Sequence, residues 1–225
     1  MRVAILSDIH SNKHAFEAVL EAISRIDAET IVCAGDVVGY CAFPNECCEI
    51  IKANASRIVK GNHDNAVIEA DTSRMNPYAA RAVRWTADSI NSSSREFLES
   101  LNAESRFRVG GRTVAMYHGS PTSVDEYVFD HDVDEDLVKS AEADILILGH
   151  THVPCIKRMA AGTFVNPGAV GQPRDGEWKA SYAVFDTETD ECVIRRVPYD
   201  VAAAADAIRE AGLPEFLAKR LHRGE

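Results

Sequence analysis

Side chains of the metal-binding type follow five separate aliphatic runs in the sequence. The motifs at the ends of these runs are "SDIH" (7–10), "GD" (35–36), "GNHD" (61–64), "HG" (118–119) and "GHTH" (149–152). Histidines at positions i and i+2, such as His150 and His152, project to the same side of an extended chain, as paired metal ligands would. The motifs therefore predict a metal site, provided that the fold brings them together.

The donor types and their number favour a two-metal site. The candidate ligands are Asp8, His10, Asp36, Asn62, His118, His150 and His152. If one carboxylate is shared, seven residues supply four bonds to each ion and leave room for water and substrate. Such sites are typical of phosphatases and related hydrolases. We expect two divalent ions, with manganese as the first choice. Imidazole, carboxylate and amide donors also suit iron, zinc, cobalt or nickel.

A purely structural role is the alternative for each motif, because a polar residue after a strand often only completes a turn. Five of the eight histidines fall within these motifs, however. A separate structural explanation for every one of them would require a coincidence. We assign structural or surface roles to the remaining histidines, His14, His131 and His222.

The motifs require a framework of alternating strands and helices. Aliphatic runs predict strands at 2–6, 30–34, 56–61, 113–118 and 144–148. Helical patterns cover 13–26, 44–54, 65–101 and 201–222, the last broken near 212–214. Four further strand-like runs, spaced like a β meander, lie at 155–159, 162–166, 180–186 and 192–198. We expect an α/β fold with a large, layered sheet. Ligands of such sheets bind beyond the carboxyl ends of the strands, so five strand ends at one sheet edge would form a single crevice.

Composition limits the classes of function. The chain has 225 residues and no linker-like segment or fixed repeat, so we expect a single domain over 1–225. Its formal charge of −11 disfavours binding to nucleic acid and to anionic membranes. To bind a small phosphorylated substrate, the acidic chain would need a local region of positive electrostatic potential, which bound metal ions would supply.

No apolar run approaches the roughly 20 residues that span a bilayer, and the N-terminus does not read as a signal peptide. A cytoplasmic location and six free thiols are therefore expected. The helical segment 201–222 either packs on the core or supports a homo-oligomer.

The five motifs, in this order, resemble those of the calcineurin-like metallophosphoesterase superfamily over about residues 3–174. The short chain, with "GDVVGYCAFPNE" (35–46) and "VNPGAVGQPRDG" (165–176), is similar to the small prokaryotic phosphodiesterase branch. The resemblance implies a layered β-sandwich flanked by helices, with a dinuclear metal site at the C-terminal ends of strands. This agrees with the α/β framework read from the sequence.

The resemblance also implies roles for individual residues. Asp8, His10, Asp36 and His152 would bind the first ion. Asp36, Asn62, His118 and His150 would bind the second, with Asp36 as the bridge. His63 would be no ligand but would act on the leaving-group side, and Asp64 would orient its ring. One position departs from the pattern: many members of the superfamily carry an Asp where this chain has Gly39.

The expected function is that of a divalent-metal-dependent phosphoesterase, and within that class a phosphodiesterase. A hydroxide that bridges the two ions would attack phosphorus and break a P–O bond. Two alternatives stay open: a phosphomonoesterase or dinucleoside polyphosphate hydrolase, and a non-catalytic scaffold or binding protein on the same fold.

Three residues are candidates for contact with the substrate. Asn12 lies at the start of the helix that follows the first motif, where phosphate could bind, although capping of the helix is the simpler role. Tyr40 follows the Asp36 loop and could line the pocket or only pack there. Arg174 could pair with phosphate through two hydrogen bonds or lie solvated on the surface.

Overall fold

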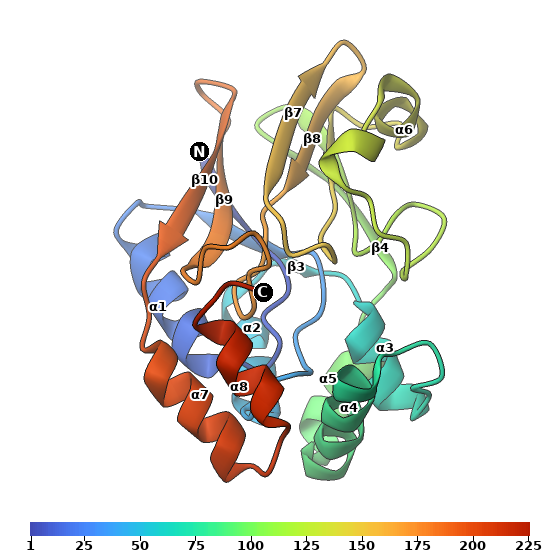
Figure 1. Ribbon diagram of the computed structural model, residues 1–225. Helices are drawn as coiled ribbons and strands as arrows, with labels where there is room; N and C mark the ends of the chain where they lie inside the picture. The colour runs from blue at the N-terminus through green and yellow to red at the C-terminus, as the bar shows by residue number, and fades with distance from the viewer.

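The computed structural model describes residues 1–225 and contains two five-stranded sheets packed face to face (Figure 1). The first sheet has the order β10 (Glu191–Val197), β9 (Ala180–Asp186), β1 (Arg2–Leu6), β2 (Thr30–Cys33), β3 (Arg57–Ile58). The second has the order β4 (Glu104–Val109), β5 (Arg112–Tyr117), β6 (Ile145–Ile147), β8 (Gly162–Asn166), β7 (Cys155–Met159). The layered α/β architecture is thereby confirmed.

Each sheet contains three parallel strands, β1–β2–β3 in one and β5–β6–β8 in the other. The five strand ends with metal-binding motifs are therefore divided between two sheets, and the expectation of a single sheet edge was wrong. The expected meander is also divided, because the β7–β8 hairpin belongs to one sheet and the β9–β10 hairpin to the other. Hairpin pairing is local, whereas the sheet that a hairpin joins depends on distant strands.

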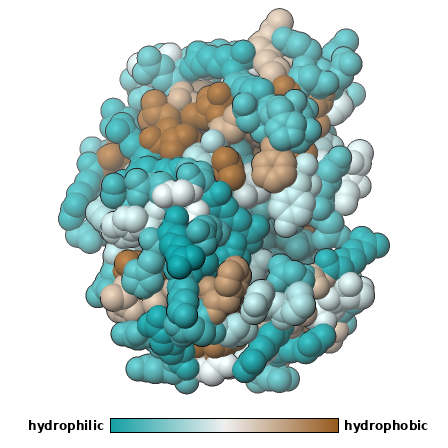
Figure 2. Space-filling model, viewed as in Figure 1, coloured by the Kyte–Doolittle hydropathy of each residue, from teal (hydrophilic) through white to brown (hydrophobic).

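The core between the sheets follows from the alternation of side chains along the strands. In β1, Val3 and Ile5 belong to the cluster between the sheets, while Ala4 and Leu6 face the helices. Strands with both faces buried read as continuous aliphatic runs, as this sequence does. Figure 2 shows hydrophobic atoms above the middle of the molecule, in the region of the two hairpins. There Ile156 of β7 packs against the edge of the inter-sheet cluster.

Most of the helices cover the outer face of the first sheet and enclose the largest hydrophobic cluster. They are α1 (Lys13–Ser24), α2 (Pro44–Asn54), α3 (Asn62–Glu69), α4 (Pro77–Ser89), α5 (Ser92–Ser100), α7 (Val201–Glu210) and α8 (Glu215–Leu221). The short helix α6 (Glu135–Ser140), preceded by the 3-10 turn η1 (Asp130–Asp132), lies on the second sheet. The predicted helices are confirmed, with 65–101 divided among α3, α4 and α5.

The C-terminal helices α7 and α8 pack on the core. Leu217, Ala218 and Leu221 of α8 are buried in the same cluster as α1 and α2. Figure 1 shows this pair of helices beside α1, with the C-terminus near the centre of the view. None of the helices in the structure combines the length and the apolarity that a bilayer crossing demands.

Candidate metal centre

The seven predicted ligands come together where strands of both sheets end. They lie in the loops after β1, β2, β5 and β6 and in the first turn of α3. Asp8, His10, Asp36, His150 and His152 all have a left-handed backbone, with φ between 49° and 66°. Such values are uncommon outside glycine and tend to collect at functional sites. The conformation turns the chain sharply at each strand end.

The first group of ligand atoms comes from Asp8, His10 and His152, all of them buried. His10 Nε2 lies 3.0 Å from His152 Nε2. Asp8 Oδ1 lies 3.3 Å from His152 Nε2 and 3.7 Å from His10 Nε2. A carboxylate and two imidazoles thus converge on one point.

The second group comes from Asp36, His118 and His150, with Asn62 beside it. His118 Nε2 lies 3.1 Å from His150 Nδ1, 3.4 Å from Asp36 Oδ2 and 3.1 Å from Asn62 Oδ1. The same Asp36 Oδ2 is also 3.5 Å from His10 Nε2 of the first group. One carboxylate oxygen therefore faces both groups, as a bridging ligand would.

Backbone carbonyls orient the four histidines of the two groups. The ring nitrogen that points away from the centre contacts a carbonyl oxygen in each case: His10 Nδ1 with Val38 (3.1 Å), His118 Nδ1 with Ala34 (2.8 Å), His152 Nδ1 with Gln172 (2.5 Å) and His150 Nε2 with Asp125 (3.3 Å). Only an N–H can donate to a carbonyl, so in a neutral ring the inward nitrogen carries a lone pair. Metal-binding histidines usually donate their outer N–H in this way, which fixes the tautomer and the orientation of the ring.

The centre fits divalent cations. Asp8 Oδ1 and Asp36 Oδ2 are buried and have no hydrogen-bond partner. Two inward-facing lone pairs, such as those of His10 and His152, cannot hydrogen-bond to each other across 3.0 Å. A cation would bind the unpartnered carboxylate oxygens and accept both nitrogen lone pairs. Two nitrogens that each lie about 2.0–2.1 Å from one ion, at a right angle to each other, are about 3 Å apart, as His10 Nε2 and His152 Nε2 are.

Without cations, the charges inside the centre act on one another. Burial alone would raise the pKa of Asp8, but the hydrogen bond and electrostatic interaction with the His152 ring, followed by the interactions with His118 and His10, hold that pKa well below its usual range. Burial lowers the pKa of His118, yet the Asp36 charge reverses this and raises it to about 10. A proton on His118 thus supplies positive charge that cations would otherwise provide, so protons and metal should compete here.

His63 lies against the first group, and its ligand atom also forms a cluster with those of His10 and Asp36. Its buried ring is 4.8 Å from the ring of His10 and 4.4 Å from that of Tyr40, measured between centroids. Its Nδ1 has no hydrogen-bond partner, and its backbone N–H donates to Asp36 Oδ1 over 2.9 Å. Burial, partly offset by the Asp36 charge, lowers the pKa of His63 to about 4. Neither ring nitrogen of His63 makes a hydrogen bond in the protein, and Nδ1 is buried.

The expected contact between Asp64 and the His63 ring is not formed. Asp64 is buried, and its carboxylate instead accepts backbone N–H bonds from Val38 (3.0 Å) and Gly61 (2.9 Å). The side chain thereby ties the loop after β2 to the start of α3. Asp64 contributes to the architecture of the centre and not to the orientation of the His63 ring.

Gly39 explains how His63 fits. This glycine has φ of +104°, and a Cβ at its position would lie 2.5 Å from His63 Nδ1. The departure from the superfamily pattern noted above thus coincides with close packing of the histidine ring over the backbone of residue 39. A larger side chain there would have to displace His63.

The three predicted substrate contacts have different surroundings. Asn12 is buried and caps α1 by accepting from Ala15 N, while its Nδ2 donates to the Gly171 carbonyl, so its side chain has a structural role. The Tyr40 ring packs 4.6 Å from that of His10. Arg174 Nη2 donates to the Tyr40 hydroxyl over 3.1 Å and is therefore drawn to the edge of the centre.

Sequence reasoning missed Arg220. Its guanidinium carbon lies 5.9 Å from the centroid of the Tyr40 ring, close to Arg174. The residue belongs to α8, whose charged pattern resembles any surface helix, so no local signal distinguishes it. The loop over residues 120–136 also reaches the centre, because the centroid of the Tyr127 ring lies 4.0 Å from that of the His150 ring.

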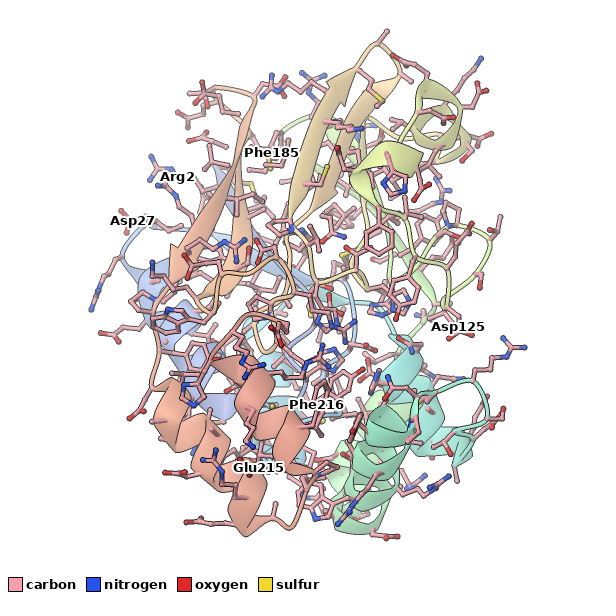
Figure 3. The ribbon with its side chains drawn as sticks, in the orientation of Figure 1. Arg2, Asp27, Asp125, Phe185, Glu215 and Phe216 are labelled. Atoms are coloured by element: carbon pink, nitrogen blue, oxygen red, sulfur yellow. The ribbon has the colours of Figure 1, made fainter.

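A cavity of about 300 Å³ opens beside the second group. Asn62 lies at its inner end, and Asn65, Glu69, Arg74 and Asp125 contribute to its polar walls. Figure 3 shows Asp125 next to α3, at the rim of this region. The cavity offers space for the part of a small substrate that extends from the metal centre.

Residues 1–190 match the family model of the calcineurin-like phosphoesterase superfamily domain. The uncharacterized protein MJ0912 of Methanocaldococcus jannaschii is 36% identical over 240 residues, covering 99% of this chain and 98% of the relative. A crystal structure of a metallophosphoesterase from Sphaerobacter thermophilus is also 36% identical, covers 100% of this chain and 99% of its own, and has a TM-score of 0.86. Phosphodiesterase YfcE of Escherichia coli K12 is 25% identical over 190 residues, or 84% of this chain and 89% of the relative.

Proposed function

The chain belongs to the calcineurin-like phosphoesterase superfamily, and we propose that it is a phosphodiesterase that uses two divalent ions, with manganese as the preferred metal. The observation that carries the proposal is the position of Asp36 Oδ2. This oxygen lies 3.5 Å from His10 Nε2 and 3.4 Å from His118 Nε2, between the two ligand groups. A shared carboxylate oxygen is what a two-metal centre requires.

Asp8, His10, Asp36 and His152 would hold one ion, and Asp36, Asn62, His118 and His150 the other. Ions in these places would lower the pKa of water to provide the nucleophile and would neutralise charge on the phosphoryl oxygens. The chain fixes the centre in place, since all the ligand side chains except Asn62 are buried and the histidine rings are anchored to backbone carbonyls. Preorganised groups of this kind need no rearrangement as charge develops.

His63 would act on the leaving group. Its neutral ring has one N–H in either tautomer, and no protein group accepts a hydrogen bond from Nδ1. The negative charge of a bound phosphate would raise its pKa from about 4 toward the working range. His63 can then stabilise the departing oxygen by a hydrogen bond or give it a proton.

Three observations support a small phosphodiester as substrate. YfcE, which bears the name phosphodiesterase, matches 84% of this chain. The cavity beside Asn62 is about 300 Å³, which suits a small molecule and not a long polymer. The formal charge of −11 also opposes long polyanions.

The test compares three nitrophenyl substrates. The protein is purified with chelator, reloaded with Mn²⁺, and assayed on bis(p-nitrophenyl) phosphate, p-nitrophenyl phosphate and p-nitrophenyl acetate. We expect metal-dependent release of nitrophenol from the diester, slower release from the monoester, and no metal-dependent cleavage of the acetate. Metal analysis of the loaded protein should give two ions per chain.

Each alternative has its own outcome. Faster cleavage of the monoester would favour a phosphomonoesterase. Full metal loading without turnover of either phosphate would favour a binding protein on the same fold. One ion per chain at saturation would contradict the shared role of Asp36.

A further inference from the structure

Two arginines approach the same tyrosine ring at the edge of the metal centre. The guanidinium carbon of Arg174 lies 5.6 Å from the centroid of the Tyr40 ring, and that of Arg220 lies 5.9 Å from it. Arg174 is in the loop before β9, and Arg220 is in α8. Two cations that are 46 residues apart in sequence therefore share one small region.

Neither arginine has an acidic side chain as a partner. Other arginines of the C-terminal segment do: Arg209 pairs with Glu215 at 2.9 Å, and Arg223 with Glu225 at 3.5 Å. Arg174 uses Nη2 for the Tyr40 hydroxyl and the Gln172 side chain, and its Nε is buried without a partner. Arg220 donates from Nε to the backbone oxygen of Glu225, which leaves its two terminal nitrogens without a hydrogen bond in the protein.

The pKa of Arg220 agrees with the absence of an acidic side chain paired with either of the two arginines. Burial, followed by the Arg174 charge, lowers the pKa of Arg220 to about 10. The charge of Glu225 offsets this effect only in part. Partly buried like charges destabilise a fold unless anions neutralise them. A guanidinium also offers paired donors that match the oxygens of a phosphate group.

The arginine pair borders the reactive part of the centre. Tyr40, which both guanidinium groups approach, packs 4.4 Å from the ring of His63 and 4.6 Å from that of His10. The Arg174 charge is also among the causes that lower the pKa of His63 and of His152. An anion held by the pair would lie on the His63 side of a phosphate at the metal centre.

Helix α8 is fixed firmly enough to present Arg220. Its residues Leu217 and Leu221 are buried, and the Phe216 ring stacks 4.5 Å from that of Tyr78 on α4. Figure 3 shows Phe216 projecting from α8 toward the α3–α5 helices. The guanidinium of Arg81 on α4 also donates to the Gly212 carbonyl over 2.9 Å, just before α8. This segment lies outside residues 1–190, which match the family model.

We propose that Arg174 and Arg220 form a subsite for a second phosphoryl group of the substrate, in addition to the scissile phosphate. The substrate class is accordingly a small phosphodiester that carries a further phosphate. The proposal rests on the proposed function, and it assigns to the C-terminal helices the selection of substrates within that function.

The first experiment measures the subsite without catalysis. Inorganic phosphate is titrated calorimetrically into chelator-treated protein, in which the carboxylates of the metal centre repel anions. We expect Arg220→Gln and Arg174→Gln each to weaken phosphate binding at least tenfold and Arg220→Lys to weaken it less. Lys219→Gln, an exposed cation of the same helix, should bind like the parent protein. Equal affinity in the parent and in both glutamine variants would overturn the subsite.

The second experiment measures selection. The Mn²⁺-loaded protein is assayed on thymidine 5′-(p-nitrophenyl phosphate) with and without a 3′-phosphate. We expect the 3′-phosphate to raise kcat/KM at least tenfold in the parent, mainly through KM, and Arg220→Gln to remove most of that advantage. Circular dichroism and thermal unfolding check the fold of each variant.

The outcomes separate this proposal from the proposed function. An equal loss of kcat/KM on both substrates in Arg220→Gln would show that the arginine acts on the scissile phosphate or on structure, and would overturn the subsite. Absence of turnover on both substrates in the parent would count against the phosphodiesterase, while the phosphate titration would still decide whether the arginine pair binds an anion.

Discussion

Asp36 and His63 are close neighbours in the centre but have different surroundings. Asp36 presents one oxygen to His10 and His118, whereas its other oxygen accepts the backbone N–H of His63. The His63 ring faces Tyr40 and makes no hydrogen bond through Nδ1. The geometry therefore separates cation binding from chemistry, and substitutions can test this separation.

We predict that His63→Ala keeps both metal ions and loses most of the turnover. Loss of a positioned proton donor lowers rates by about 10²- to 10⁴-fold. Metal content, measured by plasma emission after gel filtration, should stay at the level of the parent protein. Steady-state assays on bis(p-nitrophenyl) phosphate give the loss of kcat.

Asp36→Ala is the matched contrast, because it removes a carboxylate that faces both ligand groups. That variant should lose metal broadly as well as turnover. A His63→Ala protein with an empty centre, or an Asp36→Ala protein with a full one, would show that the two roles are assigned wrongly.

The residues of the centre differ in how well the sequence alone predicts their positions. Asp8, Asp36 and His118 stand at or shortly after the ends of aliphatic strands, so their positions alone bring them together at strand ends. Asp64 was assigned to the wrong partner, because adjacency in sequence says nothing about where a carboxylate points. Arg220 approaches Arg174 only through the docking of α8, which depends on the packing of the whole helical layer.

At the scale of elements, the loop between β2 and α2 organises the centre. It carries Asp36, supplies the Val38 carbonyl to His10 Nδ1 and the Val38 N–H to Asp64, and places Gly39 under His63. Residues 35, 36, 39 and 40 all have positive φ. The loop thus depends on a backbone path that few side chains tolerate.

We predict that Gly39→Ala lowers turnover by about 10- to 100-fold and keeps the metal. A Cβ at residue 39 would lie 2.5 Å from His63 Nδ1, so the ring must move, and small displacements of a catalytic group have effects of this size. The measurements are kcat on the diester and metal content.

Gly176→Ala is the control for backbone strain, since Gly176 also has a positive φ, +81°, but has no atom within 4 Å of the added Cβ. We expect Gly176→Ala to be less stable than the parent, by about 1 kcal/mol, with turnover unchanged. Equal losses of turnover in the two variants would mean that strain, and not contact with His63, causes the effect.

The elements themselves were predictable where hydrophobic burial sets the pattern. Buried strands such as β1 and β6 read directly as aliphatic runs. Strand β4, "ESRFRV", was not predicted, because it is an edge strand whose charged residues alternate with half-buried ones. Strand β3 was predicted over 56–61 but is confined to Arg57–Ile58, since the chain leaves the sheet early to begin α3.

At the scale of the whole molecule, the metal centre concentrates ionisable groups in a buried place. The chain has a formal charge of −11, yet burial lowers the pKa values of His10, His63, His150 and His152 and keeps these rings neutral. Buried titratable groups make the free energy of unfolding depend on pH. The metal-free protein should show this dependence most clearly.

We predict that the metal-free protein is most stable near pH 6.5–7 and loses stability toward pH 5. In the unfolded chain a histidine titrates near 6.5, whereas burial lowers the pKa of His63 to about 4 and that of His150 to about 3. Below pH 6.5 the unfolded state therefore binds protons that the folded state does not, and each such histidine removes up to about 1.4 kcal/mol per pH unit.

Two groups act in the opposite direction. Burial and the Asp36 charge raise the pKa of Asp64 to about 7. The contribution of Asp64 to the free energy of unfolding is therefore lost as pH rises from about 4 to 7, and this loss offsets the gain from one histidine. The pKa of His118, raised to about 10, stabilises the fold below pH 6.5 and ceases to do so as pH rises toward 10. Four histidines with lowered pKa values outweigh one carboxyl with a raised pKa, so the free energy of unfolding falls toward acid pH. The raised pKa of His118 accounts for the fall in this free energy toward alkaline pH.

Urea titrations in chelator at pH 5, 6, 7 and 8 measure this curve. His63→Gln should reduce the slope between pH 5 and 6.5 by up to about one proton, because it removes one buried histidine. An unchanged slope in His63→Gln would mean that the ring is protonated in the folded state. Added Mn²⁺ should raise stability most above pH 7, where protons no longer compete for the ligand nitrogens.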